Sequence, residues 1–530
     1  MHDERLFFGY YKSLMETDPW RGLSLLISYK NWDVLASLIY PTIVAIVVVF
    51  IVPIYTCYFL ITRPPTKLRK SPSNKKLSST NLLHGNPNKR ISKSYSFYYG
   101  IFVGYILFVS LLESGSGLAD FFHGQDVENI SKILRLAPTI RKGPTVPIWF
   151  QNRHIQFIPW LVQNELHKIG GGIPYERIEF SVTDCIKKTS KNCEQVDVMN
   201  DTVTLDIFPP MGTEDEGFSD NSPVIIFAPG LRCHSQDLPG NSIIRSAYGK
   251  GFRSVVMNRR GHTPEQLLRS PRWNIFGDID DLEQVYWFLK DEIVAPHTGF
   301  FLHGISSGTA VTVLGLAEFD RRRAANPQER VPVFVGATTV TPGYDIQEVM
   351  QPDRFKWPYN PLLNLAVKDH FILQNEKILR DFNSKAVDNA LKSNTLQEFV
   401  NATAAFTGFE DPETYYEFTN PVKGLHHITT PTFVLNSLDD PCCAIQNLYE
   451  KSKYPAHNGL SYADVIKTSP SAIVAVTHLG SHCPFLDGYW PFVKDPFTKG
   501  VMLKSWADQS IIDFYSAAME VYGDRKFLMN

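Results

Sequence analysis

The fold of this 530-residue chain is decided by one stretch, Gly299-Phe300-Phe301-Leu302-His303-Gly304-Ile305-Ser306-Ser307-Gly308-Thr309-Ala310-Val311. The apolar run that begins it predicts a buried strand, and the residues after Gly308 predict the start of a helix. Between them stands the pattern G-x-S-x-G. A serine on a sharp strand-to-helix turn needs small residues two positions before and after it, because larger ones clash with neighbouring backbone. The pattern therefore predicts that Ser306 is a nucleophile.

Two backbone N–H groups are expected to stabilise the negative charge that such a nucleophile creates. Ser307 lacks a glycine two positions before it, so we expect it to contribute its N–H rather than its hydroxyl. The helix that starts there also directs the positive end of its dipole at the same place. The second donor is expected after the apolar run 224–228, in Pro229-Gly230-Leu231-Arg232. Gly230 permits a tight bend, which makes the Leu231 N–H the predicted partner.

A serine hydroxyl also needs a base, and that base needs a carboxylate to hold it. The carboxylate is expected after the apolar run 432–435, where the sequence reads Asn436-Ser437-Leu438-Asp439-Asp440-Pro441. We prefer Asp440, which stands immediately before the turn-forming proline, and Asp439 remains the alternative. The aspartate without this role is expected to be a solvated turn carboxylate.

The base is expected after the apolar run 472–476, where two histidines compete. The sequence there reads Thr477-His478-Leu479-Gly480-Ser481-His482-Cys483-Pro484. We prefer His482, because it lies in the loop behind Gly480-Ser481, where a turn can bring the imidazole back to Ser306. His478 lies close to the end of the predicted strand and is expected to be structural.

Apolar runs of strand length recur from about residue 144, and polar or amphipathic stretches of helix length separate them. Strands buried on both faces read as continuous apolar runs, and helices supply their crossovers. The fold class is therefore α/β, with a doubly wound, mostly parallel sheet. The segment 343–428 contains no convincing strand. It is expected to be a helical lid whose aromatic residues either line an acyl-chain pocket or belong to the core; these are Tyr344, Phe355, Trp357, Tyr359 and Phe371.

Composition excludes several other classes of protein. With 44% hydrophobic and 13% aromatic residues, the chain is too apolar to be disordered. Lys and Arg number 52 against 54 Asp and Glu, so no overall field attracts nucleic acid. The seven cysteines form no C-x-x-C pair and no Cys/His cluster at zinc spacing. We therefore expect no metal, no cofactor and no nucleic-acid partner.

The N-terminal part of the chain is expected to be membrane-bound. After a tail at 1–33, the residues 34–62 carry no charge. This uncharged run is longer than the roughly 20 apolar residues that are needed to cross a bilayer. The linker 63–93 has nine basic and no acidic residues, which places it in the cytoplasm by the positive-inside rule. A second uncharged run, 94–112, is barely long enough to span and is predicted to be a second transmembrane segment or an interfacial one.

The side of the membrane on which the globular domain lies depends on that second run. If 94–112 spans, the domain is lumenal or extracellular; if it lies in the interface, the domain is cytosolic. Glycosylation sequons at Asn129, Asn200 and Asn401 would suit a lumenal domain. The chain is expected to be an integral protein of the endoplasmic reticulum or the plasma membrane, with the bilayer as one partner and no protein partner identified.

Taken together, these features resemble the α/β-hydrolase superfamily, and within it the AB-hydrolase-domain group of membrane-anchored esterases and lipases. Plant embryogenesis-associated hydrolases and yeast medium-chain ethyl ester esterases are relatives of that group. The resemblance covers roughly residues 144–527. Besides G-x-S-x-G it rests on 149–156, Asp201–Asp206, Arg259-Arg260-Gly261-His262, Ser270-Pro271-Arg272, Gly277-Asp278, Asp439-Asp440-Pro441 and Gly480-Ser481-His482. The chain departs from the group at Pro229-Gly230, where His-Gly is usual, and at Gly480-Ser481-His482, where Gly-Gly-His is usual.

The resemblance implies a serine carboxylic ester hydrolase that acts on lipid esters, as an acylglycerol lipase or a phospholipase, through an acyl-enzyme. Two alternatives stay open. One is acyl transfer to an alcohol, for which an H-x-x-x-x-D pattern can be read from His482 to Asp487. The other is a membrane-tethered binding or signalling protein that uses the same fold without turnover.

Overall fold

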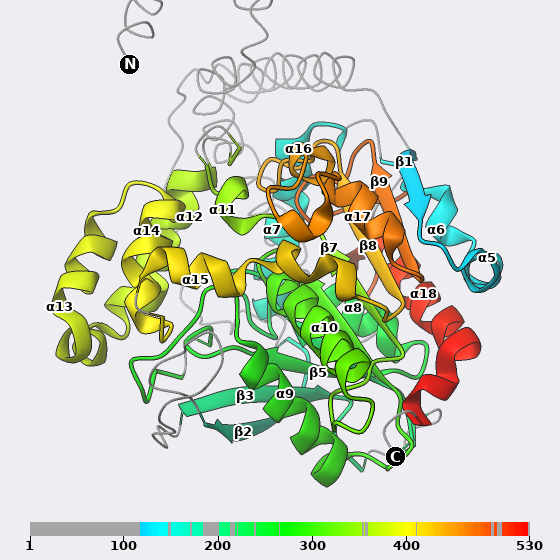
Figure 1. Cartoon of the computed structure of the whole chain (residues 1–530), viewed down its shortest axis with the longest axis horizontal. Coiled ribbons are helices and arrows are strands. Elements are labelled where there is room, and N and C mark those ends of the chain that lie inside the picture. Colours follow the sequence, from blue (N-terminus) through cyan, green and yellow to red (C-terminus); the bar gives the residue numbers. More distant parts are fainter. Residues whose placement is uncertain are drawn as a thin grey trace, which may run out of the picture. The chain divides into compact units, whose positions relative to one another are not determined.

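A nine-stranded sheet organises the described part of the chain, shown in Figure 1. The computed structural model describes residues 117–527 except 147–149, 170–171, 184–200, 213–217, 220, 238–239, 264–265, 352–353, 356–358, 410, 489–491 and 496–500. The strand order is β1 (Leu118–His123), β9 (Ala472–Thr477), β8 (Thr432–Ser437), β7 (Gly336–Val340), β6 (Phe300–Ile305), β4 (Val224–Ala228), β5 (Arg253–Asn258), β3 (Asp201–Phe208) and β2 (Glu176–Val182).

The centre of this sheet is parallel and its margins are antiparallel. Neighbours from β9 through β5 in the sheet pair in parallel. The strands β1, β2 and β3 pair antiparallel to their neighbours. The predicted mostly parallel sheet is therefore confirmed. The sheet also includes β1, which precedes residue 144, where we expected the globular domain to begin.

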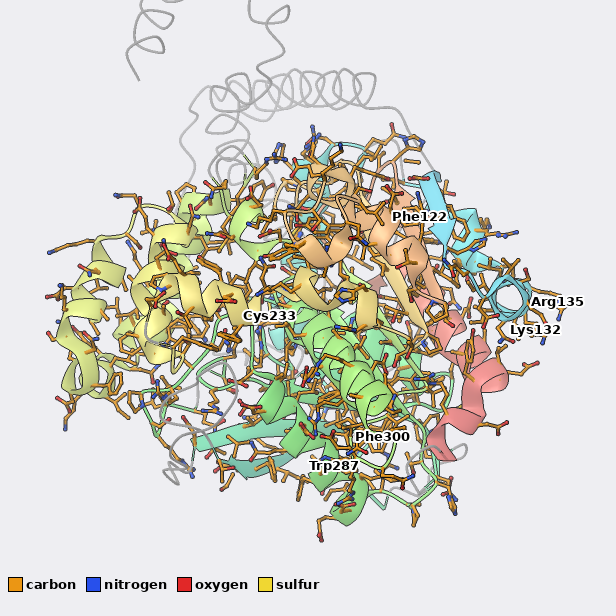
Figure 2. The ribbon with its side chains drawn as sticks, viewed as in Figure 1. Phe122, Lys132, Arg135, Cys233, Trp287 and Phe300 are labelled. Atoms are coloured by element: carbon orange, nitrogen blue, oxygen red, sulfur yellow. The ribbon has the colours of Figure 1, made fainter. Side chains whose placement is uncertain are left out.

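Alternation along the strands builds one apolar core on each face of the sheet. In β4, Val224 and Ile226 join the core that contains the helix α10 (Gly308–Ala325), whereas Ile225 and Phe227 join the core that contains the helix α18 (Trp506–Tyr522). All four side chains are at most 2% exposed, because helices cover both faces. Figure 2 shows how densely side chains fill these layers, and it labels Phe300 at the start of β6.

The helices lie in two layers, one on each face of the sheet. One face carries α9 (Ile279–Phe288), α10 (Gly308–Ala325) and α17 (Tyr462–Thr468); the other carries α5 (Val127–Leu136), α6 (Thr139–Lys142), α8 (Gly240–Tyr248) and α18 (Trp506–Tyr522). Elsewhere the structure has α7 (Arg153–Ile169), α16 (Gln446–Tyr449), a π-helix at Leu289–Ile293, 3₁₀ turns at Pro455–His457 and Gly523–Phe527, and the antiparallel pair β10 (Phe492–Lys494) and β11 (Val501–Leu503).

The segment between β7 and β8, which we call the lid segment (residues 343–428), is helical in its described residues. It comprises α11 (Ile346–Val349), α12 (Tyr359–Val367), a π-helix at Lys368–Leu373, α13 (Glu376–Lys392), α14 (Leu396–Thr403), a 3₁₀ turn at Ala404–Phe406, α15 (Pro412–Thr419) and a 3₁₀ helix at Pro421–His427. Phe371 is fully buried and stacks on Trp273 with ring centroids 4.5 Å apart. Phe355 and Tyr344 are also buried, so these aromatics pack the lid segment onto the body. Trp357 lies outside the described residues.

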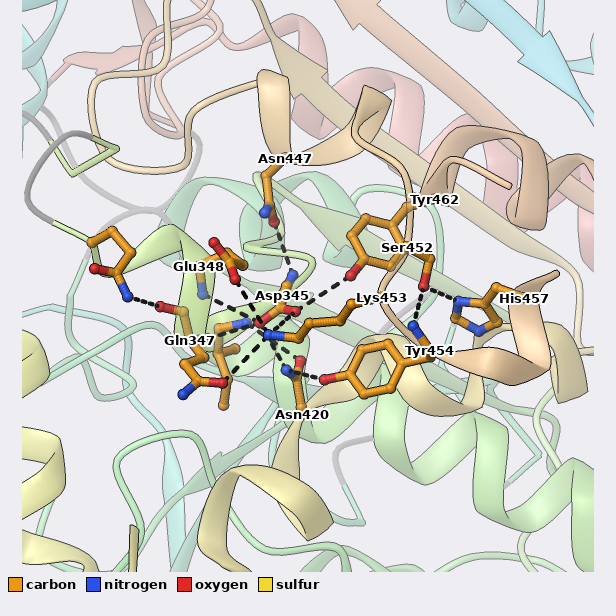
Figure 3. A network of polar contacts seen from close by, with 12 residues as sticks. Asp345, Gln347, Glu348, Asn420, Asn447, Ser452, Lys453, Tyr454, His457 and Tyr462 are labelled. Carbon is orange, nitrogen blue, oxygen red and sulfur yellow. Dashed lines mark hydrogen bonds and ion pairs between the residues drawn. The ribbon is translucent and has the colours of Figure 1, made fainter. Parts of the chain in front are cut away.

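The two ends of the lid segment are joined to each other, as Figure 3 shows. Asp345, fully buried, caps α11 by accepting from the N–H groups of Gln347 and Glu348. At the other end of the segment, Asn420 donates to the same carboxylate at 2.8 Å. Lys453, from the body, pairs with that carboxylate at 3.1 Å. The lid segment therefore leaves and re-enters the sheet through one polar network.

The predicted N-terminal features lie outside the described residues. These are the tail 1–33, the span 34–62, the linker 63–93 and the run 94–112. None of the helices in the described part of the chain has both the length and the apolar character needed to cross a bilayer.

Candidate active site

Ser306 lies on the sharp turn between β6 and α10. Its φ of +52° is one that residues with a side chain rarely adopt. The turn is held to the neighbouring strand by the hydrogen bond from the Ser306 N–H to the Val340 carbonyl, at 2.9 Å. A Cβ atom added to Gly304 would lie 2.3 Å from Thr312 Oγ1, and one added to Gly308 would lie 2.0 Å from the Ala228 carbonyl oxygen. The two glycines of the pattern are thus required by close backbone and side-chain approach.

The structure brings Ser306, His482 and Asp440 into one hydrogen-bonded line. His482 Nε2 lies 2.8 Å from Ser306 Oγ. On the other side of the ring, His482 Nδ1 lies 2.9 Å from Asp440 Oδ2 and 3.1 Å from Oδ1. The Asp440 carboxylate is 3% exposed and also accepts from the N–H groups of Cys442 and Cys443 at 2.7 and 2.9 Å. Of the two candidate aspartates, Asp440 is therefore the one that holds the imidazole.

The electrostatics of the pair favour a charged imidazole. Burial lowers the pKa of His482, but the neighbouring Asp440 carboxylate, with Cys483 acting in the same direction, holds this pKa well above the usual value of 6.5. The competing His478 is exposed, and its N–H donates to the Gly117 carbonyl at the start of β1. His478 lies in the loop but does not contact Ser306 or either aspartate in any hydrogen bond among the described residues.

Asp439 is not the solvated turn carboxylate that the sequence suggests for the remaining aspartate. It is 4% exposed, and its Oδ1 accepts from the N–H groups of Gly480 and Ser481 at 2.9 and 2.8 Å. Its Oδ2 accepts from Gln156 Nε2 at 3.1 Å. Both N–H groups belong to the loop that carries His482, so Asp439 fixes that loop.

The loop before His482 is held at further points. Ser481 has a φ of +52°, and its carbonyl accepts from Ser437 Oγ at 2.8 Å. Its own hydroxyl donates to the Arg153 carbonyl of α7 at 2.7 Å. Arg153 and Gln156, which hold this loop, belong to the stretch 149–156, where the sequence shows only a resemblance to the esterase and lipase group. No local pattern in the sequence signals a contact between residues so distant along the chain.

The two expected N–H donors are both available beside Ser306. The loop after β4 turns through Gly230, whose carbonyl accepts from the Cys233 N–H at 3.2 Å. A Cβ atom on Gly230 would lie 3.4 Å from Ser306 Cβ, so this backbone packs directly against the nucleophile. Among the hydrogen bonds of the described residues, neither the Leu231 N–H nor the Ser307 N–H has an acceptor. Pro229, which stands where histidine is usual in the group, has no N–H of its own, but the two predicted donors, Leu231 and Ser307, both keep theirs.

One cluster in the described part of the chain has ligand atoms close enough together for a metal ion, and it overlaps this site. It consists of Asp440, Cys442 and His482, whose ligand atoms lie within 4.8 Å of one another. Two of the three are already hydrogen-bonded to each other, and burial raises the pKa of the Cys442 thiol, which disfavours the thiolate that metals bind. The cluster is part of the serine site rather than a separate centre.

Comparison with known proteins gives distant similarity to lipases. Monoacylglycerol lipase ABHD2 of Danio rerio is 26% identical over 324 residues, 60% of this chain and 68% of that protein. Phospholipase ABHD3 of Homo sapiens is 25% identical over 274 residues, 51% of this chain and 60% of that protein. The solved structure of the esterase Pf2001 of Pyrococcus furiosus aligns with a TM-score of 0.30 and 12% identity, covering 60% of this chain and 84% of its own. No family model matches.

The fold assignment follows from the strand order, the serine on the turn after β6, and the chain order serine, aspartate, histidine. The sequence similarity to ABHD2 and ABHD3 points the same way. The chain has the fold and the order of site residues of the α/β-hydrolase superfamily, and its sequence is distantly similar to lipases and phospholipases of the ABHD2 and ABHD3 type.

Proposed function

We propose that this chain is a membrane-associated serine esterase that cleaves carboxylic esters of lipids. The observation that carries the proposal is the line from Ser306 through His482 to Asp440, with distances of 2.8 and 2.9 Å. Beside the serine are two N–H groups that have no acceptor among the described residues. This arrangement combines a nucleophile, a base, a group that orients the base, and donors for an oxyanion. Acyl transfer needs these four parts.

The reaction runs in two halves. Ser306 Oγ attacks the ester carbonyl while His482 Nε2 takes its proton, and the Leu231 and Ser307 N–H groups bind the oxyanion. His482 then returns the proton to the departing alcohol, which leaves an acyl-enzyme. A water molecule, activated by the same imidazole, releases the fatty acid. Asp440 keeps the Nδ1 proton in place and stabilises the imidazolium.

Lipid esters are the proposed substrate class because the relatives are lipases. ABHD2 is named a monoacylglycerol lipase and ABHD3 a phospholipase, which supports an acylglycerol or a phospholipid as substrate here. The uncharged runs 34–62 and 94–112 support a membrane anchor, which would hold the enzyme at the surface where insoluble esters reside. We propose the endoplasmic reticulum or the plasma membrane as its location.

The proposal is tested with a fluorophosphonate probe and a panel of lipid esters on the full chain. The wild type should be labelled and should release fatty acid, and Ser306→Ala should do neither. A folded wild type that is neither labelled nor active would favour the non-catalytic binding protein. Acyl-ester products that appear only when an alcohol is added, without fatty acid release, would favour the acyltransferase.

A further inference from the structure

Arg259 is a buried cation that the proposed reaction does not yet use. It follows β5, and the residue is 4% exposed. Among the described residues no carboxylate forms an ion pair with it, although its neighbour Arg260 pairs with Asp281. Burial lowers the pKa of Arg259 to about 10, so the guanidinium still carries its charge at neutral pH. A buried charge without an anionic partner is costly, so its contacts call for an explanation.

Those contacts converge on the loop beside Ser306. Nη2 of Arg259 lies 2.8 Å from the Pro229 carbonyl oxygen, 3.0 Å from the Gly230 carbonyl oxygen and 3.1 Å from Ser307 Oγ. Nη1 donates to the Ile275 carbonyl at 2.9 Å. One planar group thus joins the loop after β4 to the residue that follows the nucleophile.

The contact with Gly230 controls an N–H group. The Gly230 carbonyl and the Leu231 N–H belong to the same planar peptide unit, in which the C=O and N–H bonds point in opposite directions. The contact with Arg259, together with the hydrogen bond that the same carbonyl accepts from the Cys233 N–H, therefore fixes the direction of the Leu231 N–H. A cation bound to the carbonyl oxygen also polarises the peptide, which strengthens the N–H as a donor.

We propose that Arg259 is a positioning residue that aims the Leu231 N–H at the oxyanion and holds the Pro229-Gly230 loop against Ser306. The inference rests on the proposed esterase function. Its effect belongs to the transition state, since the oxyanion exists only there. Loss of Arg259 is therefore expected to lower kcat while the KM for a soluble ester stays close to that of the wild type.

The experiment compares Arg259→Met, which keeps the volume without the charge, with Arg259→Lys, which keeps the charge without the planar fork. Arg259→Met should lose about 10²-fold or more in kcat, the usual effect of losing one oxyanion donor. Arg259→Lys should fall between it and the wild type, because an ammonium group is a single point that cannot hold four acceptors. Adding guanidinium at low millimolar concentration to Arg259→Ala should recover part of the kcat.

Arg260→Met is the matched control, because it removes a neighbouring buried arginine that is paired with Asp281 instead of the loop. It should lower the melting temperature and leave kcat nearly unchanged. Folded Arg259 variants with wild-type kcat, or equal kcat losses in the two Met variants, would overturn the inference. If Arg259→Met does not fold, the Lys variant and guanidinium rescue decide alone.

The wild type separates this inference from the proposed function. A wild type that is unlabelled by fluorophosphonate and inactive on esters overturns the esterase function, and the role of Arg259 falls with it. An active wild type whose Arg259 variants are equally active overturns the role of Arg259 alone.

Discussion

Ser306 and Ser307 are adjacent serines with opposite expected sensitivities to mutation. Ser306→Ala should abolish fluorophosphonate labelling and lower turnover by roughly 10⁴-fold or more, because it removes the nucleophile. Ser307→Ala should keep most of the activity, since its part in the reaction is its N–H, although it loses the contact between Ser307 Oγ and Arg259. Activity-based labelling and steady-state kinetics measure both. Ser307→Ala with the greater loss would contradict the assignment.

The adjacent aspartates should differ in the same way. Asp440→Asn leaves the wrong tautomer of His482 and should lower kcat by about 10⁴-fold. Asp439→Asn keeps an oxygen that can accept from the Gly480 and Ser481 N–H groups, so its kcat should fall far less. The comparison is made by kinetics on protein of checked fold. Equal losses would mean that the direct contact with His482 is not the one that matters.

The pH dependence follows from the raised pKa of His482. The base works only when neutral, so kcat/KM should rise with pH through an apparent pKa above 6.5. The stability of the fold changes in the opposite direction. Because the folded state binds the His482 proton more tightly, this proton stabilises the folded state fully at pH values below the pKa of the unfolded state. This gain is lost as pH rises through the folded pKa. Measurements of kcat/KM and of the melting temperature as a function of pH check the two predictions. An apparent pKa below 6.5 in the kcat/KM profile would contradict the raised pKa of His482.

At the residue scale, the sequence predicted those site residues that a local sequence pattern indicates. G-x-S-x-G and the ends of two apolar runs favour Ser306, His482 and Asp440, with Asp439 left as the alternative carboxylate. The structure brings the three favoured residues together. Asp439 holds the loop that carries His482, and its partners lie on that loop and on α7. This role depends on contacts between residues that are distant along the chain. It was therefore missed, as was the convergence of Arg259 on the Pro229-Gly230 loop.

At the scale of elements, the turn between β6 and α10 depends on a close approach. A Cβ atom on Gly308 would lie 2.0 Å from the Ala228 carbonyl oxygen, a backbone atom that cannot rotate away. Gly308→Ala should therefore destabilise the protein by about 1–3 kcal/mol and also displace Ser306. Thermal unfolding and probe labelling report the two effects. Gly459→Ala is a comparison without this clash, because a Cβ atom on Gly459 meets nothing within 4 Å. It adds only the backbone strain of a φ of +72°.

The lid segment offers a second prediction at this scale. Asp345→Ala removes the acceptor shared by the α11 N–H groups, Asn420 and Lys453, and should cost about 1–3 kcal/mol for the buried donors left unpaired. Hydrogen exchange should speed up at both ends of the lid segment together. Asp464→Asn, which breaks an exposed pair with Lys467, should change stability by less than about 1 kcal/mol. Faster hydrogen exchange at only one end would contradict the connection between the two ends of the lid segment.

Element prediction succeeded where strands are buried on both faces, because such strands read as continuous apolar runs. The strand β1 was missed, since Leu118–His123 includes Asp120 and His123 and its side chains are only half-buried at the edge of the sheet. Of the aromatics singled out in the lid segment, Tyr359 and Phe371 lie in helical elements, and Trp357 lies outside the described residues. Sequence alone did not separate pocket from core, and Phe371, stacked on Trp273, belongs to the core.

At the scale of the whole molecule, the membrane topology remains a prediction. With two spans, the domain beyond residue 112 lies on the lumenal or extracellular side, and the sequon at Asn401, an exposed residue of α14, should be glycosylated in microsomes. Asn401→Gln should remove that glycan and its shift in gel mobility. Digestion of the intact domain by protease added from the cytosolic side would contradict two spans.

The hydrogen bonds that connect the two ends of the lid segment have an evolutionary consequence. Because Asp345 and Asn420 share hydrogen bonds, the inserted segment begins and ends at one place, like an exchangeable cassette. Lengthening or shortening a loop between fixed ends changes its closure entropy only slowly with length. Related enzymes can therefore diverge in this cassette, through insertion or recombination, while β7 and β8 keep their register and the serine turn keeps its geometry. Chimeras joined at these two residues are a rational starting point for changing which ester is accepted.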